Sequence, residues 1–540
     1  MAVVEFDYSE LKEQVDLSKE EMVETLSGIG APSEEKEGKI IIELTPNRPD
    51  LFSKEGIVRA IKSYLGKEIG LKEYLAKKSD HKVYVDPSVK KIRPHTVCAV
   101  IKGIRFDDKE IENMVQLQDK LNATLGRKGK KFGIGFYPLE NIVFPVSYTT
   151  MKPEDIKYHP LNYPHEATAK EILAKHPKGA EYGHLLAKAE RYPVFLDGNK
   201  KIMCLIPIVN SQETGKVTTE TKKVFVEVTG TDKNTITVAL NIICCTYADA
   251  GGEIHTVTVV DGKKPESYPK LEPKKMNLNL KYVNKILGTE ITATEMKKYL
   301  ERMGYGVEKN KVLIPCYRAD IIHQVDLIED VAIAYGYNDF EPSLPNFFSK
   351  GELVDSYSEE HEILRGMGFD EIRTYILKNR QRAMLSTDGK LKEVLNPCTE
   401  DFQVIRNNLI TDILEVFSTN RIRGLPQKIY EVGQIYEDGK TKTKIIFGVM
   451  DKKVDFSIFR GYLQTLMFEK RINFYLQKSI VKSKVFEIEE CGEIKTSLPK
   501  GSETLSKQKP KGIVGKVDKK MLLNEFGVEF PVYICEFCYE

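Results

Sequence analysis

Four acidic residues in the second half of the chain have a spacing that suits a metal ion. Asp326, Glu329 and Asp330 are three and four positions apart, which places their carboxylates on one face of a helix, and Asp320 precedes them. Carboxylates this close repel one another unless a cation compensates them, and hard oxygen ligands suit Mg²⁺. Two alternatives stay open, because acidic residues at a helix start also complement its dipole and Arg318 could neutralise part of the cluster.

The signatures of common enzyme sites are absent from the sequence. The chain has no GxxxxGK[ST] phosphate loop, no GxSxG nucleophile elbow and no HExxH metal motif, and the glycines at 133 and 135 lack the third glycine of a dinucleotide fingerprint. Cys535 and Cys538 form a CxxC without a second pair, so a zinc or redox role there is the less favoured interpretation. Generic motifs therefore do not identify an activity.

Composition restricts the class of protein. The 540 residues include 81 Lys plus Arg and 79 Asp plus Glu, a formal net charge of +2, which excludes a polybasic protein but permits a local basic patch. At roughly 150 residues per domain, three to four domains are expected. The acidic start has no signal-peptide pattern, and no apolar stretch approaches the ~20 residues of a membrane helix. We expect a soluble cytoplasmic protein with no membrane contact.

Periodicity and turn residues divide the chain into four segments, at 1–85, 90–270, 275–345 and 355–540. The first predicts short helices at 9–15 and 19–26, a strand, and a helix that Asp50 or Ser53 can cap and that Gly66 ends. The second is a β-rich α+β domain with one buried helix near 235–250. The third predicts a helix at 277–287, a second helix opened by a capping box of Thr292 and Glu295, and a strand, an order typical of winged-helix domains. The fourth alternates helices and strands.

Short strings along nearly the whole chain recur in one known family. They are Pro46-Asn47-Arg48-Pro49-Asp50, Glu55-Gly56-x-x-Arg59, Ile92-Arg93-Pro94, Val228-Thr229-Gly230-Thr231-Asp232, Arg318-Ala319-Asp320-Ile321, Arg406-Asn407-Asn408-Leu409 and Tyr430-Glu431-Val432-Gly433. In these strings and their order the chain resembles the β subunit of phenylalanyl-tRNA synthetase, archaeal/eukaryotic cytosolic type.

The resemblance implies a subunit that does not itself charge tRNA. In that family the β chain pairs with an α subunit that binds ATP and phenylalanine, in an (αβ)₂ heterotetramer that binds tRNA(Phe). The implied fold is multidomain α+β, with a β-rich editing-type domain, a winged-helix-like domain and a class II synthetase-like antiparallel sheet domain at 355–540. This chain lacks GxGxGxxR, HIGH and KMSKS strings, as a non-catalytic domain would. The resemblance also favours Mg²⁺ at Asp320, Asp326, Glu329 and Asp330.

The β-rich domain of that family hydrolyses Tyr-tRNA(Phe). A pocket for phenylalanine rejects an added hydroxyl by only about 10²-fold, so a second site that prefers the hydroxyl makes physical sense. The resemblance makes Glu227 the acceptor for the phenol, and Thr229 lies on the same strand face. Ser211 would orient water or the ester carbonyl, and Met203 would contact the aromatic ring of the substrate.

The chain departs from the family beside this pocket. Where the family carries a His-Asp pair after a glycine, this chain has Phe136-Tyr137, so the sequence leaves open how far hydrolysis survives. A basic loop in the same domain could contact tRNA phosphates, or it could be ordinary solvated surface. Its residues are Arg127, Lys128, Lys130 and Lys131.

Two other functions remain as alternatives. The winged-helix-like segment could bind DNA or act as a scaffold, since Lys297, Lys298 and Arg302 on its second helix supply a phosphate patch, although that helix lacks base-reading residues. A free-standing hydrolase acting in trans is the third possibility. The synthetase-like tail at 355–540, which has no active site of its own, argues for a subunit interface instead.

Overall fold

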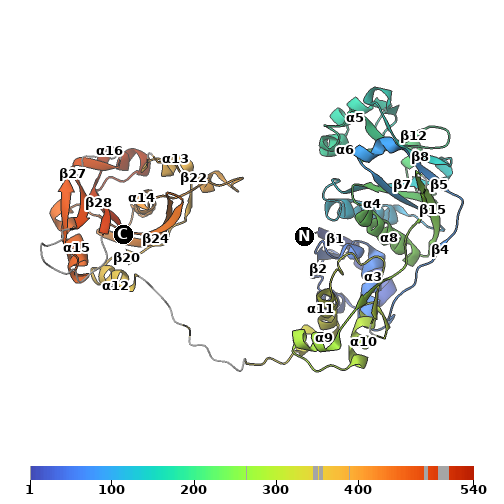
Figure 1. Cartoon of the computed structure of the whole chain (residues 1–540), viewed down its shortest axis with the longest axis horizontal. Helices are drawn as coiled ribbons and strands as arrows, with labels where there is room; N and C mark the ends of the chain where they lie inside the picture. Colours follow the sequence, from blue (N-terminus) through green and yellow to red (C-terminus); the bar gives the residue numbers. More distant parts are fainter. Residues whose placement is uncertain are drawn as a thin grey trace. The chain divides into compact units, whose positions relative to one another are not determined.

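The chain forms two compact units, Met1–Leu344 and Pro345–Glu540, which are described separately (Figure 1). The computed structural model describes residues 2–262, 264–309, 311–344, 351, 357–387, 389–478, 485–496 and 510–539. The predicted boundary between the third and fourth segments lies largely outside the described residues.

A small α/β module opens the first unit. Strands β1 (Ala2–Asp7), β3 (Lys39–Leu44) and β2 (Ser33–Lys36) form an antiparallel sheet in that order. The helices expected at 9–15 and 19–26 are α1 (Tyr8–Val15) and α2 (Lys19–Gly28). Helix α3 (Lys54–Tyr64) begins where the Ser53 hydroxyl accepts the Gly56 amide at 3.1 Å.

An 11-stranded sheet dominates the first unit. Its main path runs β13-β12-β11-β8-β5-β15-β6-β14-β7, and β16 and β4 pair with β15. The strands are β4 (Ala76–Lys77), β5 (Lys82–Val85), β6 (His95–Lys102), β7 (Phe132–Pro138), β8 (Val146–Met151), β11 (Tyr192–Leu196), β12 (Ile202–Leu205), β13 (Val209–Asn210), β14 (Lys223–Gly230), β15 (Glu253–Asp261) and β16 (Lys264–Tyr268). Residues 76–85, predicted to belong to the first segment, therefore pair with this sheet.

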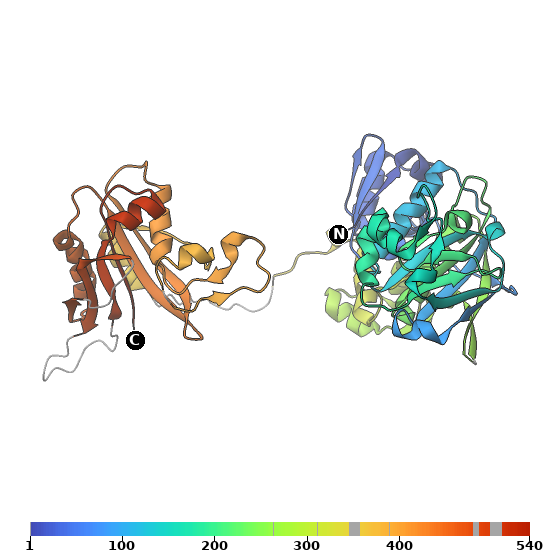
Figure 2. The same ribbon diagram turned by 90° about the horizontal axis from the view of Figure 1, so that it is seen from above.

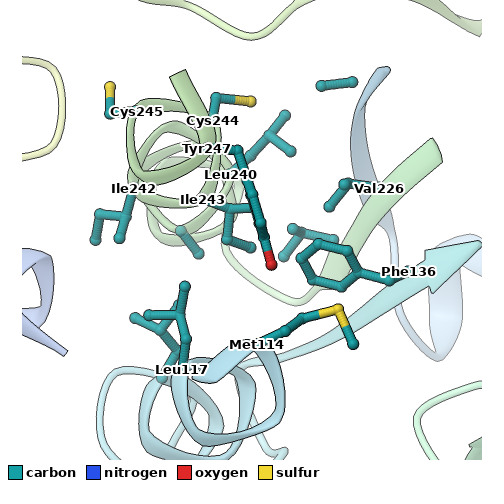
Figure 3. Close-up of a cluster of buried hydrophobic side chains, with 14 of the residues drawn as sticks. Met114, Leu117, Phe136, Val226, Leu240, Ile242, Ile243, Cys244, Cys245 and Tyr247 are labelled. Atoms are coloured by element: carbon teal, nitrogen blue, oxygen red, sulfur yellow. The ribbon is translucent and has the colours of Figure 1, made fainter. Parts of the chain in front are cut away.

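One face of this sheet is covered by the predicted buried helix. Helix α8 (Lys233–Asp249) packs against β6 and β14, and its apolar residues meet Val226 and Phe136 (Figure 3). Helix α4 (Asp108–Ala123) contributes Met114 and Leu117 to the same cluster. Because side chains alternate along a strand, the residues of β14 and β7 that do not face α8 point to the opposite side of the sheet.

The third segment has the predicted order of elements. It contains β17 (Lys274–Asn277), α9 (Leu280–Leu287), α10 (Ala293–Arg302), a hairpin of β18 (Gly306–Glu308) and β19 (Lys311–Ile314), and α11 (Gln324–Tyr335). The first helix, predicted from residue 277, begins at Leu280 because the Asn279 side chain caps it. The predicted capping box of Thr292 and Glu295 opens α10.

The second unit is a seven-stranded sheet with helices on both faces (Figures 1 and 2). Its strand order is β20 (Asp370–Glu371), β24 (Gln427–Glu437), β25 (Lys440–Met450), β29 (Val532–Tyr539), β28 (Pro510–Val517), β27 (Phe486–Thr496) and β26 (Phe474–Lys478), antiparallel except for the β20–β24 pair. Helix α14 (Ile410–Thr419) packs on one face, and α12 (Ser358–Gly366) and α15 (Phe456–Glu469) pack on the other.

Candidate hydrolytic pocket

Two glycines of β7 make room in front of the predicted recognition residues. In the antiparallel pairing of β14 with β7, Glu227 lies opposite Gly135 and Thr229 opposite Gly133. A Cβ at residue 135 would lie 2.6 Å from Glu227 Oε1, and one at residue 133 would lie 3.0 Å from Pro207 Cβ. Larger side chains at these two positions would therefore fill the space beside Glu227 and Thr229.

This space is a pocket of about 200 Å³. An apolar cavity of about 150 Å³ accommodates benzene, so the pocket has room for a phenol ring. It is lined by Gln118, Asp119, Asn122, Gly133, Ile134, Leu161, Lys178, Tyr182, Cys204, Leu205, Ile206, Pro207, Ile208, Val209, Asn210, Glu227 and Thr229. The lining combines aliphatic residues with polar ones, since Gln118, Asp119, Asn122, Lys178 and Asn210 accompany the two predicted polar residues.

The two polar residues have atoms without partners. Glu227 and Thr229 are 3% and 0% exposed, and neither Glu227 Oε2 nor Thr229 Oγ1 has a hydrogen-bond partner among the described residues. Burial raises the pKa of Glu227 to about 8, although Arg93 and the neighbouring hydroxyls of Tyr137 and Thr229 oppose this shift. A buried polar atom without a partner is costly, so a ligand that supplies one gains affinity here.

Arg93 is the cation with the largest effect on the pKa of Glu227, and the sequence analysis assigned it no role in the site. Its side chain is buried, with Nε donating to the Thr229 carbonyl at 3.2 Å and both terminal nitrogens donating to the Gly129 carbonyl at 3.1 Å. The guanidinium thus ties the end of β14 to the basic loop. Its positive charge is also the largest influence that lowers the pKa of Glu227, and it therefore opposes protonation of that carboxyl.

Ser211 and Met203 are not placed as predicted. Ser211 is buried as the N-cap of the short helix α7 (Gln212–Gly215), where its hydroxyl accepts the Glu213 amide at 3.3 Å, and it does not line the pocket. Met203 packs in the hydrophobic core, and its neighbour Cys204 lines the pocket instead. Alternation along β12 explains the second difference, because one position along a strand reverses the face.

The basic loop follows α4 and is held close to the pocket. Arg127, Lys128 and Lys130 are exposed, and Lys131 is half-buried. Gly129 adopts a φ of 76°, and a Cβ there would lie 3.3 Å from the ring of Tyr182, a pocket residue. The loop therefore presents its charges near one wall of the pocket.

The four acidic residues do not converge on a shared point. Arg318 donates to both carboxylate oxygens of Asp320, at 2.9 and 2.7 Å, and its NH2 atom is 2.7 Å from Asp330 Oδ2. Asp326 instead accepts the amides of Ile322 and His323 at the start of α11. The alternative in which Arg318 neutralises part of the cluster therefore describes the first pair, and helix capping describes Asp326.

Glu329, another of the four predicted metal ligands, is also engaged within the chain. It is exposed and accepts the Tyr337 hydroxyl at 2.5 Å. Among the described residues, which include Cys535 and Cys538, no group of three or more Asp, Glu, His or Cys side chains could hold a metal ion. The predicted Mg²⁺ ligands do not fit a common metal site, because an arginine and backbone amides already compensate their charge.

Two family models match consecutive parts of the chain. A tRNA synthetase B5 domain matches residues 276–337, and a phenylalanyl tRNA synthetase beta chain CLM domain matches 355–539. Curated phenylalanine–tRNA ligase beta subunits are similar over nearly the whole chain. The protein from Pyrococcus abyssi is 35% identical, covering 93% of this chain and 91% of the relative, and that from Methanosphaera stadtmanae is 34% identical, covering 99% of each.

The chain belongs to the phenylalanine–tRNA ligase β subunit family. An N-terminal fragment of the phenylalanyl-tRNA synthetase β subunit from Pyrococcus horikoshii also resembles it, with a TM-score of 0.59 and 37% identity over 62% of this chain and 99% of the fragment. The predicted resemblance is thereby confirmed. A mixed α/β multidomain architecture is confirmed with it.

Several strings that indicated this family hold the structure together. Arg48 binds both oxygens of the buried Asp50 at 2.9 Å, and a Cβ on Gly56 would lie 1.9 Å from the Asp50 carbonyl oxygen. In the second unit, Arg406 NH2 donates to Glu431 at 2.9 Å, and both side chains are almost fully buried. These residues act in folding, and the pocket residues are separate from them.

Two of the three basic residues proposed for DNA binding make contacts within the chain, and the third, Lys298, is exposed. Arg302 donates to the carbonyls of Tyr64 and Ala334, at 3.0 and 2.8 Å, and Lys297 lies 3.6 Å from Glu301. A phosphate patch on α10 would have to give up these contacts. In the part of the chain that is described, no helix has the length and apolar character needed to cross a membrane.

Proposed function

We propose that this chain is the editing and assembly subunit of a phenylalanine–tRNA ligase and hydrolyses Tyr-tRNA(Phe) in the pocket of Glu227. Its partner would be an α subunit that binds ATP and phenylalanine, in an (αβ)₂ heterotetramer. The observation that carries the proposal is the pair of unpartnered buried oxygens, Glu227 Oε2 and Thr229 Oγ1, at the wall of a pocket large enough for a phenol.

The pocket would select tyrosine through the hydroxyl group. A phenol donates a hydrogen bond to Glu227 Oε2, whereas phenylalanine would leave that oxygen buried and without a partner. Sites built to bind a substrate hydroxyl can reject the analogue that lacks it by about 10⁴-fold. The aliphatic residues of the lining would contact either ring equally, so discrimination would rest on this acceptor.

Hydrolysis would use water and groups of the substrate. The lining residues include no serine or histidine, and burial raises the pKa of the Cys204 thiol far above neutrality, so that thiol is a poor nucleophile. The free ribose hydroxyl of the terminal nucleotide and a bound water can serve in place of a protein nucleophile. The pocket then contributes binding and orientation.

The remaining parts of the chain would hold tRNA and the partner. The exposed charges of Arg127, Lys128 and Lys130, fixed near the pocket by Arg93, suit the tRNA backbone. The second unit, a class II synthetase-like sheet without catalytic motifs, would form the subunit interface. We assign no Mg²⁺ to the acidic cluster, since its charges are compensated within the chain.

The experiment that tests this proposal measures deacylation of Tyr-tRNA(Phe) by the chain reconstituted with its α subunit. Glu227→Gln keeps the shape of the side chain but removes its charge. Above pH 8, where Glu227 is ionised, we expect deacylation to fall by about 10- to 100-fold, in line with the ~1.5–3 kcal/mol of a hydrogen bond to a charged group. Phe-tRNA synthesis should be unchanged.

Glu140→Gln is the matched control, because Glu140 is an exposed glutamate in the same domain and not part of the pocket. Its deacylation rate should equal that of the wild type. Equal deacylation by Glu227→Gln and the wild type would refute the assignment of the pocket. Absence of a complex with the α subunit would refute the assembly role.

A further inference from the structure

One face of α8 contacts two other parts of the first unit. Asn241, Cys245 and Asp249 follow one another at intervals of four residues, so they lie along one side of the helix. Asn241 Nδ2 donates to the Cys316 carbonyl at 3.3 Å, and the Sγ atoms of Cys245 and Cys316 are 3.6 Å apart. Asp249 forms an ion pair with Arg59 of α3. This face of α8 therefore holds Cys316 by both its backbone and its sulfur.

The two thiols belong to different parts of the chain. Cys245 lies in the helix that covers the large sheet, and Cys316 lies 71 positions further along, within the residues matched by the B5 domain. Both are buried, with exposed fractions of 0% and 8%, and all nine cysteines of the chain are free thiols in the structure. The sulfur atoms are already in van der Waals contact, so a bond between them needs side-chain movements of only about 1–2 Å.

The two sulfur atoms have different electrostatic surroundings. The hydrogen bond from the Cys245 thiol lowers the pKa of Cys316, and the positive charge of Arg59 lowers it further, although burial opposes both effects. Burial raises the pKa of Cys245 well above its ordinary value. Cys316 is therefore the sulfur that more readily becomes a thiolate, which is the nucleophilic form of cysteine.

A cavity of about 250 Å³ lies beside this pair. Its lining includes Arg59 and Tyr317, and the Arg59 guanidinium carbon is 4.0 Å from the centroid of the Tyr317 ring. Tyr317 follows Cys316 directly in the chain. The cavity therefore brings solvent to the neighbour of Cys316, from which a molecule as small as hydrogen peroxide has only a short distance to travel.

We propose that Cys245 and Cys316 form a redox modification site, at which a small hydroperoxide converts the two thiols to a disulfide that links α8 to the segment between β19 and α11. This bond would join the B5-matched residues covalently to the domain of the large sheet. It uses no residue of the Glu227 pocket, so it does not depend on the proposed function.

The hydroperoxide is the only oxidant that this reaction needs. The Cys316 thiolate attacks the O–O bond, which breaks to give a sulfenic acid and an alkoxide or hydroxide that takes up the proton Cys316 had lost. The Cys245 sulfur then attacks the sulfenic sulfur, and hydroxide leaves with the Cys245 proton as water. The two thiols lose two electrons, and the hydroperoxide is reduced to one alcohol and one water, or to two waters when it is hydrogen peroxide.

The experiment treats the purified full-length chain with hydrogen peroxide, alkylates the remaining thiols and identifies linked peptides by mass spectrometry. We expect a linked pair that carries Cys245 and Cys316 and that dithiothreitol separates. Cys245→Ser and Cys316→Ser should each lose it. Cys244→Ser is the matched control and should keep the link, because Cys244 is also buried in α8 but leaves the helix in a different direction (Figure 3).

The melting temperature supplies a second readout. Oxidation should raise it by about 5 °C in the wild type and in Cys244→Ser, because the bond closes a loop of about 70 residues, and it should leave that of Cys245→Ser unchanged.

The wild-type chain alone can overturn the proposal, even where a variant fails to fold. The exposed Cys398 reports that the peroxide has reacted, so oxidised Cys398 without the linked peptides would overturn it. Oxidation of Cys316 to a sulfinic acid without a link would do the same. Persistence of the link in Cys245→Ser would assign it to Cys244 and would also overturn the proposal.

Discussion

At the scale of single residues, the buried carboxyl of Glu227, proposed to recognise the substrate, also lowers the stability of the fold above its ordinary pKa. Its pKa of about 8 in the folded chain exceeds the ordinary value of 4.5, so the native state holds a proton that the unfolded state releases between these pH values. The free energy of unfolding therefore falls as pH rises from about 4.5 to 8. Buried carboxyl groups with a raised pKa are typical of functional sites.

Glu227→Gln should remove this pH dependence. We expect the melting temperature of the variant to match that of the wild type near pH 4.5 and to exceed it by about 5 °C at pH 8, where the wild type must ionise a buried carboxyl. Scanning calorimetry across this range measures the difference. If the melting temperatures of the wild type and Glu227→Gln differed by the same amount at both ends of this pH range, the raised pKa would be contradicted.

Single residues also mark how far the sequence could predict the pocket. The shared strand face of Glu227 and Thr229 could be predicted because it needed only local alternation within and just before the family string that begins at Val228. Ser211 and Met203 were misplaced because a cap and a one-position change of face depend on where β12 ends. Arg93 and Asn210 reach the site through long-range contacts, for which the sequence has no local signal.

At the scale of secondary-structure elements, glycines and buried ion pairs connect the family strings to the fold. Gly56 lets the first turn of α3 approach the Asp50 carbonyl, which a Cβ would meet at 1.9 Å. The sequence predicted α3 and its Ser53 cap, since both follow from periodicity and capping. It did not predict that β4 and β5 join the large sheet, because their partner β15 lies far along the chain.

Arg406→Met should destabilise the second unit. Arg406 donates to Glu431, to Thr374 Oγ1 at 2.6 Å and to the Gln434 carbonyl at 2.8 Å, and the side chains of Arg406 and Glu431 are buried. Loss of the guanidinium leaves the Glu431 carboxylate without its cation, which costs about 3–5 kcal/mol. Urea unfolding of the variant measures this change. Arg380→Met, at an exposed ion pair with Glu393, should change stability by less than about 1 kcal/mol.

At the scale of the whole molecule, the acidic cluster and the two units give different kinds of prediction. Because Arg318 and backbone amides compensate the cluster, the melting temperature of the isolated chain should not change on addition of EDTA or of millimolar Mg²⁺. A rise in melting temperature with Mg²⁺ that Asp320→Asn abolishes would restore the metal site that the spacing permitted and the family resemblance favoured. Calorimetry with and without chelator decides between them.

The division into two compact units predicts that editing and assembly can be separated. The pocket, the basic loop and Arg93 all lie within residues 1–344, and a solved fragment of a relative corresponds to this part of the chain. We expect a 1–344 fragment to fold cooperatively and to deacylate Tyr-tRNA(Phe), at about a tenth of the rate of the complex because it has fewer contacts with tRNA. It should not co-purify with the α subunit, whereas a 357–540 fragment should.

The physical reason is that each unit has its own hydrophobic core, so neither needs the other to bury its apolar residues. Co-purification of the α subunit with residues 1–344 alone would show that the interface lies in the first unit and would contradict this prediction. A folded 1–344 fragment without deacylation, beside an active complex, would show that the second unit or the α subunit completes the hydrolytic site.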